Sequence, residues 1–167
     1  KTDIFVFTPK GDQRRIEKGA TVLDFAYSIH TDIGNTAIAA KVNLKLVPLS
    51  YVLKTGDQVE IITAEKEHPK REWLQFIKTS KARKLILDYM KSQRQSSVNL
   101  GKKMLEEGLK SLGRKLNDKT VKSLMDEFEI FDSKPEEMYF KIGSGLISLD
   151  GLSEKLKKYH GINKESY

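Results

Sequence analysis

The chain contains no cysteine, which excludes a disulfide framework and any thiolate metal site. No apolar run approaches the roughly 18 to 20 residues that are needed to span a bilayer. The first residues, Lys1-Thr2-Asp3, also lack the apolar core of a signal peptide. We therefore expect a cytoplasmic protein with no membrane partner. Because the chain begins without methionine, we also expect it to be a piece of a longer protein.

Patterns typical of catalysis or metal binding are missing as well. The histidines His30, His68 and His160 are scattered, and no glycine-rich phosphate loop follows a predicted strand. The short Gly143-Ser144-Gly145 segment is better explained as a turn that ends a helix. We therefore expect no catalytic residue, no metal ion and no cofactor in this chain, so that it is not an enzyme by itself.

Positive charge is concentrated in one segment of the chain. Residues 65–103 hold 11 basic and 4 acidic residues, whereas residues 1–64 hold 8 and 7, and residues 104–167 hold 11 and 12. A local basic stripe attracts phosphate backbones without specifying their sequence. A solvated helix face is the alternative interpretation, since lysine-rich surfaces are common. The basic candidates for RNA contact in this segment are Arg71, Lys78, Lys81, Arg83 and Lys84.

Residues 1–64 alternate between strand signals and turn signals. The strands are predicted at residues 4–8, 13–18, 36–42, 46–49 and 58–63, and the turns at 9–12, 43–45 and 54–57. One helix is predicted between the second and third strands. Two strands, a helix and then two or three strands predict an α+β domain with the β-grasp, ubiquitin-like fold.

The predicted helix of this domain is amphipathic and begins after Thr21, a favoured N-cap residue. Its buried face is predicted from apolar residues at the spacing i, i+3, i+4, i+7: Val22, Phe25, Ala26 and Ile29. We expect Tyr27 and His30 to lie on the flank of this face and Asp24 to point away from it. His30 then closes the helix at its C-terminal end, where the helix dipole favours a cationic side chain.

Beyond a polar stretch that contains Pro69, the apolar period becomes that of helices. Trp73 is expected to be a hydrophobic anchor for this junction rather than a stacking platform. Helix starts are predicted near residues 117, 133 and 148–150. One buried helical stripe is predicted to comprise Leu100, Met104, Leu105, Leu109, Leu112 and Leu116. The predicted organisation is a β-grasp domain at 1–64, a basic junction at 65–80 and a small all-α helical domain at 81–167.

Three motifs stand out in the first domain: Phe7–Asp12 (FTPKGD), Ala26–Asp32 (AYSIHTD) and Gly56–Ile61 (GDQVEI). They closely resemble the TGS domain, which is named after threonyl-tRNA synthetases, certain GTPases and SpoT. The continuation Arg71–Arg83 is similar to the junction between the TGS and helical domains of long RelA/SpoT homologues. These homologues are the stringent-response enzymes that make and hydrolyse (p)ppGpp, the GTP pyrophosphokinase family. The junction disfavours the TGS domain of a GTPase or of a threonyl-tRNA synthetase.

The resemblance implies a regulatory region whose hydrolase and synthetase domains lie outside this chain. It implies that the TGS domain contacts the 3′ CCA end of deacylated tRNA on the ribosome, with His30 at the contact. Imidazole can hydrogen-bond and stack, as recognition of single-stranded RNA requires. A pocket closed around a free 3′ hydroxyl would exclude an esterified amino acid by its size. A purely helix-terminal role remains the alternative for His30.

Other RNA-binding candidates are Thr31 beside His30, Tyr27 and Lys10. Tyr27 can stack on a base or pack in the core, and Lys10 can touch phosphate or remain solvated. RelA-type sequences often carry His-Arg where this chain has Asn35-Thr36, so we expect RNA binding either to rely on the basic junction or to be weaker. The alternative function is a protein-interaction module for acyl carrier protein, as in the SpoT branch, or for the enzyme's own catalytic domains.

Overall fold

The computed structural model describes residues 2–156, which pack as parts of two compact units, residues 1–90 and 91–167. The first unit combines strands and helices and the second is helical, which confirms the predicted α+β class. The domain limits predicted after residues 64 and 80 stay predictions, but residues 65–80 belong to the first unit. None of the described helices has the length and apolar composition that crossing a bilayer requires.

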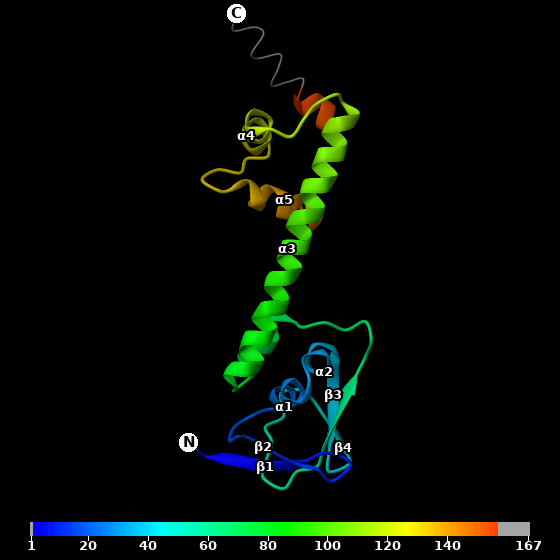
Figure 1. Ribbon diagram of the computed structural model, residues 1–167, viewed down its shortest axis with the longest axis vertical. Helices are drawn as coiled ribbons and strands as arrows, with labels where there is room; N and C mark the ends of the chain where they lie inside the picture. The colour runs from blue at the N-terminus through cyan, green and yellow to red at the C-terminus, as the bar shows by residue number, and fades with distance from the viewer. Residues whose placement is uncertain (1, 157–167) are drawn as a thin grey trace, which may run out of the picture. The chain divides into compact units, whose positions relative to one another are not determined.

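Five short strands form the sheet region of the first unit (Figure 1). They are β1 (Asp3–Phe7), β2 (Gln13–Glu17), β3 (Ala37–Val42), β4 (Lys45–Val47) and β5 (Val59–Thr63). β1 pairs antiparallel with β2, and β3 lies between β4 and β5 with antiparallel pairing on both sides. A parallel bridge between Phe7 and Gln58 places β1 beside β5. The resulting order, β2-β1-β5-β3-β4, is the predicted β-grasp arrangement.

Two helices follow the hairpin, where the sequence predicted one. α1 (Val22–Ile29) begins at the predicted cap, since the Thr21 hydroxyl accepts a hydrogen bond from the Asp24 N–H. α1 packs against β3 and β5. α2 (Thr31–Thr36) follows after a single residue and was missed, because six residues are too few to show a helical period. A short 3₁₀ helix, η1 (Arg71–Gln75), lies in the junction.

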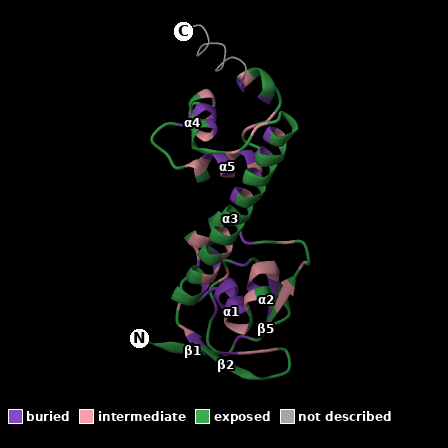
Figure 2. Ribbon diagram, turned by 45° about the horizontal axis from the view of Figure 1, so that its top comes forward, coloured by how far each residue is buried: buried purple, intermediate pink, exposed green. Residues whose placement is uncertain are grey.

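The core of the first unit surrounds α1, which Figure 2 shows as buried along most of its length. Val22, Phe25 and Ala26 are fully buried, as predicted. Trp73 retains only 5% of its surface and belongs to this same core, which confirms its role as a hydrophobic anchor. The junction is therefore packed into the β-grasp unit, because its apolar residues complete the core that the strands and α1 begin.

Helices of the second unit begin near the predicted residues. α3 (Ser80–Ser111) runs from the first unit into the second, and α4 (Asp118–Glu127) and α5 (Pro135–Gly143) follow. Asn117 caps α4 by accepting a hydrogen bond from the Thr120 N–H at 2.9 Å. Helical structure resumes at Leu152. Gly145 has φ +84° just after α5, so the glycine segment is the predicted helix-ending turn.

The apolar stripe predicted along α3 is partly wrong. Leu105 and Leu109 are fully buried, but half of the Leu100 surface is exposed, and Met104 and Leu112 are exposed as well. The buried face of α3 includes Gly101 instead. A Cβ atom there would overlap the carbonyl oxygen of Tyr139 in α5, so the two helices meet backbone to backbone. The buried residues of α3 in the second unit are therefore Val98, Gly101, Leu105 and Leu109.

Candidate nucleic-acid interface

His30 lies between α1 and α2 and belongs to both helix ends. Its backbone N–H donates to the Ala26 carbonyl at 3.3 Å, which ends α1 as predicted. Its ring Nδ1 accepts a hydrogen bond from the Asp32 N–H at 3.0 Å, which caps α2. The imidazole therefore also serves the N-terminus of the second helix, while His30 remains the C-cap residue of the first. Its side chain remains 63% exposed.

The cap determines which ring nitrogen of His30 faces a ligand. Because Nδ1 accepts a hydrogen bond, the proton of the neutral imidazole is assigned to Nε2. Nε2–H is then the donor that the exposed ring offers. Such a donor can bond a ribose hydroxyl, a phosphate oxygen or an acceptor on a base edge. Thr31, the first residue of α2, lies directly beside it and is partly exposed.

Tyr27 does not line this surface, and the prediction that it stacks on a base is corrected. Its side chain is fully buried, and its hydroxyl donates to the Asn35 Oδ1 at 2.8 Å. Its ring packs against Gly34, where a Cβ atom would overlap it. Burial raises the pKa of the Tyr27 hydroxyl, and Tyr89 adds to the increase. Tyr27 and Asn35 thus hold α2 on α1, and Asn35 directs its side chain inward rather than toward a ligand.

Lys10 is exposed in the turn between β1 and β2, at the far end of β5 from α2. The neighbouring Pro9 carbonyl accepts from the Gln58 side chain, just before β5 begins. The end of α2 is bonded to Ala64, just after β5 ends. Five strand residues span about 17 Å. The structure therefore does not bring Lys10 and His30 together, and Lys10 would contact a different part of any RNA.

Asp24 was predicted to point away from the buried face of α1, but it is itself buried. It is 1% exposed, and its carboxylate accepts the Thr21 N–H at 2.8 Å, the Lys78 N–H at 2.9 Å and the Thr79 N–H at 3.0 Å. The hydroxyls of Thr21 and Thr79 donate to it as well. We call this arrangement the Asp24 clasp. The capping-box spacing of Thr21 and Asp24 indicates the hydrogen bonds from Thr21, but not those from Lys78 and Thr79.

The clasp fixes where the basic junction meets the domain. Lys78 and Thr79 are held at the N-terminal end of α1, whereas His30 lies at its C-terminal end. Eight helical residues separate the two ends by about 12 Å. The five basic candidates predicted in the junction and in the first turns of α3 are all exposed: Arg71, Lys78, Lys81, Arg83 and Lys84.

Two of these basic residues have partners within the first unit. Arg83 donates to the Leu74 carbonyl at 3.3 Å, and Lys84 forms an ion pair with Asp88 at 2.7 Å. Arg71, Lys78 and Lys81 form no ion pair with residues in the described range 2–156. Over that same range, no three acidic or histidine side chains form a group that could hold a metal ion. His160 lies outside the described residues.

Two family models match this chain, one in each part. The TGS domain matches residues 4–63, and the RelA/SpoT AH domain matches residues 89–157. The chain belongs to the RelA/SpoT family. The resemblance found in the three motifs and the Trp73 junction is thereby confirmed. Residues 64–88 of this RelA/SpoT chain, which include Trp73 and the residues held by Asp24, lie between the two matches.

Relatives of this RelA/SpoT chain carry two kinds of name. It is 39% identical over 164 residues to the GTP pyrophosphokinase of Myxococcus xanthus, covering 96% of the chain and 22% of that protein. It is 44% identical over 147 residues to the guanosine-3′,5′-bis(diphosphate) 3′-pyrophosphohydrolase of Aquifex aeolicus, covering 87% and 21%. The GTP pyrophosphokinase of Escherichia coli K12 is 38% identical over 152 residues, covering 88% and 20%. The chain thus spans about a fifth of the length of these relatives.

Proposed function

We propose that this chain is the regulatory region of a cytoplasmic (p)ppGpp synthetase/hydrolase. Its TGS domain recognises the 3′ CCA end of deacylated tRNA on the ribosome and controls catalytic domains outside this chain. The chain itself catalyses no reaction. The single observation that carries the proposal is the His30 imidazole, which caps α2 through Nδ1 and presents Nε2–H on a 63% exposed side chain.

His30 supplies the discrimination in this proposal. Its ring is held by the Asp32 N–H, so the Nε2–H direction is fixed before a ligand arrives. A fixed donor binds with a smaller loss of conformational entropy than a freely rotating one. The terminal ribose of deacylated tRNA offers hydroxyl oxygens as acceptors. An esterified amino acid would occupy one of these oxygens and add bulk beside the ring.

Affinity comes from the basic junction in this proposal. Phosphate contacts position an RNA and add through charge, whereas contacts to its end specify it. Arg71, Lys78 and Lys81 are exposed and attached to the same unit as His30. For a single strand, each neutralised phosphate contributes about 0.7 to the slope of log affinity against log salt. Replacing Lys78 and Lys81 by alanine should therefore lower this slope by about 1.4.

The decisive experiment must separate the ring of His30 from its capping role. His30→Ala removes both, whereas His30→Asn retains a favoured N-cap residue and removes the imidazole. Binding of deacylated and aminoacylated tRNA is measured on ribosomes for the wild type and both variants. We expect the wild type to prefer deacylated tRNA and His30→Asn to lose at least tenfold of this preference while its fluorescence spectrum stays unchanged.

His68→Asn is the matched control for the ring. His68 is also exposed in the first unit, where its ring stacks on Tyr89 with the centroids 6.4 Å apart. This variant should keep the wild-type preference. Equal binding of both tRNA forms by every variant would refute the sensor function. The alternative function is a protein-interaction module. It would be indicated if a protein partner, acyl carrier protein or the catalytic domains, stayed bound after nuclease treatment and was lost when the junction lysines were replaced.

A further inference from the structure

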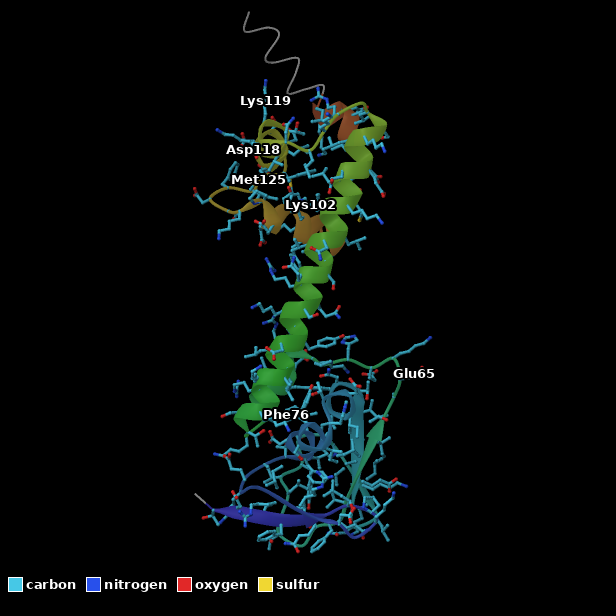
Figure 3. All side chains as sticks on the ribbon, in the orientation of Figure 1. Glu65, Phe76, Lys102, Asp118, Lys119 and Met125 are labelled. Carbon is cyan, nitrogen blue, oxygen red and sulfur yellow. The ribbon has the colours of Figure 1, made fainter. Side chains whose placement is uncertain are left out.

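A cleft of about 480 Å³ lies in the second unit, between α4 and the loop that leads to α5. α4 contributes residues 118, 121, 122, 125 and 126, the loop contributes residues 130–133, and α5 contributes its first residue, Pro135. We call this feature the α4 cleft. Figure 3 labels Asp118 and Met125, two residues of its helical wall. Neither tRNA recognition nor the proposed role of His30 uses this cleft.

Two apolar residues of α4 line the cleft at the edge of the core side of this helix. Its core side is formed by Thr120, Ser123 and Leu124, which are buried. The cleft residues at positions 118, 121, 122 and 125 have the spacing i, i+3, i+4, i+7, so they form one stripe, whose apolar members Val121 and Met125 also pack against the edge of the core. Val121 and Met125 in this stripe are only partly buried. The α4 cleft therefore has an apolar floor that the described chain does not cover fully.

The loop wall adds an aromatic side chain that the backbone holds at the surface. Ile130 is buried in the core, but its neighbour Phe131 is 63% exposed and lines the cleft. The residues that flank this pair, Glu129 and Asp132, have φ of 58° and 53°. A left-handed conformation is unfavourable for a residue other than glycine. An exposed aromatic beside an apolar floor is the usual anchor of a protein interface.

The charge of this region identifies the chemistry of the occupant. Three aspartates and one lysine line the cleft. Residues 118–137 contain seven acidic and three basic residues, whereas the whole chain has a net charge of +7. This acidic surface repels phosphate and attracts positive charge. An RNA is therefore disfavoured here, and a basic polypeptide is favoured.

We propose that the α4 cleft is a docking site for a basic amphipathic helix of a partner protein. Its apolar face would pack on Val121, Met125 and Phe131, in the way that grooves bind helices with anchors at i, i+3 and i+4. Its lysines or arginines would pair with Asp118 and Asp126 at the rim. The helical wall spans two turns, or about 12 Å, which matches a partner segment of two to three turns.

The test uses the whole ¹⁵N-labelled chain and synthetic peptides of defined pattern. The first peptide is a helix with leucine on one face and lysine on the other. The second has the same composition in an order that gives no apolar face, and the third replaces every lysine by glutamate. We expect the first peptide to bind at least tenfold more tightly than the other two. Its amide shift changes should be confined to α4 and residues 130–133.

Two substitutions assign the binding to the cleft. Phe131→Ala and Asp126→Asn change exposed side chains, so both variants should fold. We expect Phe131→Ala to weaken the first peptide at least tenfold and Asp126→Asn about threefold. Leu146→Ala is the matched control, because Leu146 is 70% exposed in the same unit and does not line the cleft.

Four results would overturn the proposal. The first two are equal binding of all three peptides and amide shift changes elsewhere in the chain. The third is an effect of Phe131→Ala no larger than that of Leu146→Ala. The fourth is self-association of the chain that Phe131→Ala abolishes. The last result, read by sedimentation velocity of the chain alone, would assign the cleft to a second copy. Because none of these measurements involves tRNA, failure here is distinguishable from failure of the sensor function.

Discussion

Removal of the Asp24 carboxylate should destabilise the first unit more than any surface substitution. The carboxylate accepts five hydrogen bonds from Thr21, Lys78 and Thr79 while only 1% exposed. A hydrogen bond to a charged group contributes about 1.5 to 3 kcal/mol, and a buried donor without a partner costs about 1 to 3 kcal/mol. These contributions are not additive, so we expect Asp24→Ala to lower the free energy of unfolding by about 3 to 5 kcal/mol.

The two carboxylate oxygens allow a graded test. Oδ2 accepts from Thr21 and Lys78, and Oδ1 accepts from Thr79. Asparagine retains one acceptor oxygen, but its amide NH₂ group would face donors that have lost their acceptor. Asp24→Asn should therefore lower the free energy of unfolding by about 2 kcal/mol. In a double-mutant cycle of Asp24→Asn with Thr79→Val, the coupling energy between the two side chains should be about 0.5 to 3 kcal/mol, as is typical for side chains in one hydrogen-bond network.

The assay is urea unfolding followed by tryptophan fluorescence. Trp73 is the single tryptophan of the chain and is 5% exposed in the first unit, so its emission reports on that unit. The control is Asp32→Asn, because that carboxylate is 87% exposed. The Asp24→Ala loss corresponds to a melting temperature at least about 12 °C lower. If Asp24→Ala shifted the transition no more than Asp32→Asn, the clasp would not stabilise the fold.

Three further predictions concern other parts of the chain. Gly101→Ala should destabilise the second unit by about 3 kcal/mol, because the added Cβ meets the Tyr139 carbonyl; circular dichroism should detect this loss, and a wild-type melting curve would contradict it. Burial raises the pKa of the Tyr27 hydroxyl, so this hydroxyl ionises at a lower pH in the unfolded chain than in the folded one. The free energy of unfolding that Tyr27 contributes below about pH 10 is therefore lost as the pH rises further. Tyr27→Phe should reduce this alkaline loss of stability, measured by urea unfolding at several pH values. It should also lower stability near neutral pH, because the hydrogen bond to Asn35 is lost. An unchanged dependence on alkaline pH would assign the loss to other groups. Leu44 has φ 71° in a turn and is 84% exposed, so Leu44→Gly should raise the free energy of unfolding by about 0.5 to 1 kcal/mol in the same urea assay, whereas a decrease would show that the side chain is needed.

Local patterns predicted the elements of this fold, because each depends on neighbours in the sequence. The Thr21 cap and the first three residues of the buried face of α1 follow from spacing alone. The cap at Asn117 and the turn after Gly143 do as well. The order of strands and helix was then enough to predict the β-grasp arrangement, since few folds accept that order.

Contacts between distant residues were not predictable in this way. Asp24 looked like a solvated residue because its partners Lys78 and Thr79 lie more than 50 positions away. Leu100 and Leu105 looked equivalent because the periodicity of α3 does not reveal that Gly101 allows another helix to approach. At the candidate site, the motif identified His30 but not its hydrogen bond to Asp32, since a six-residue helix has almost no periodic signal.

The Asp24 clasp also constrains the order in which this protein can mature during synthesis. The TGS match ends at residue 63, but Asp24 remains without two of its partners until Lys78 and Thr79 have been added. Trp73 and Ile77, which complete the same core, arrive equally late. A nascent chain that ends near residue 64 therefore holds a carboxylate and an apolar surface that are both incompletely covered. The segment that folds together is thus longer than the matched TGS domain, and its core is completed only when the junction has been synthesised.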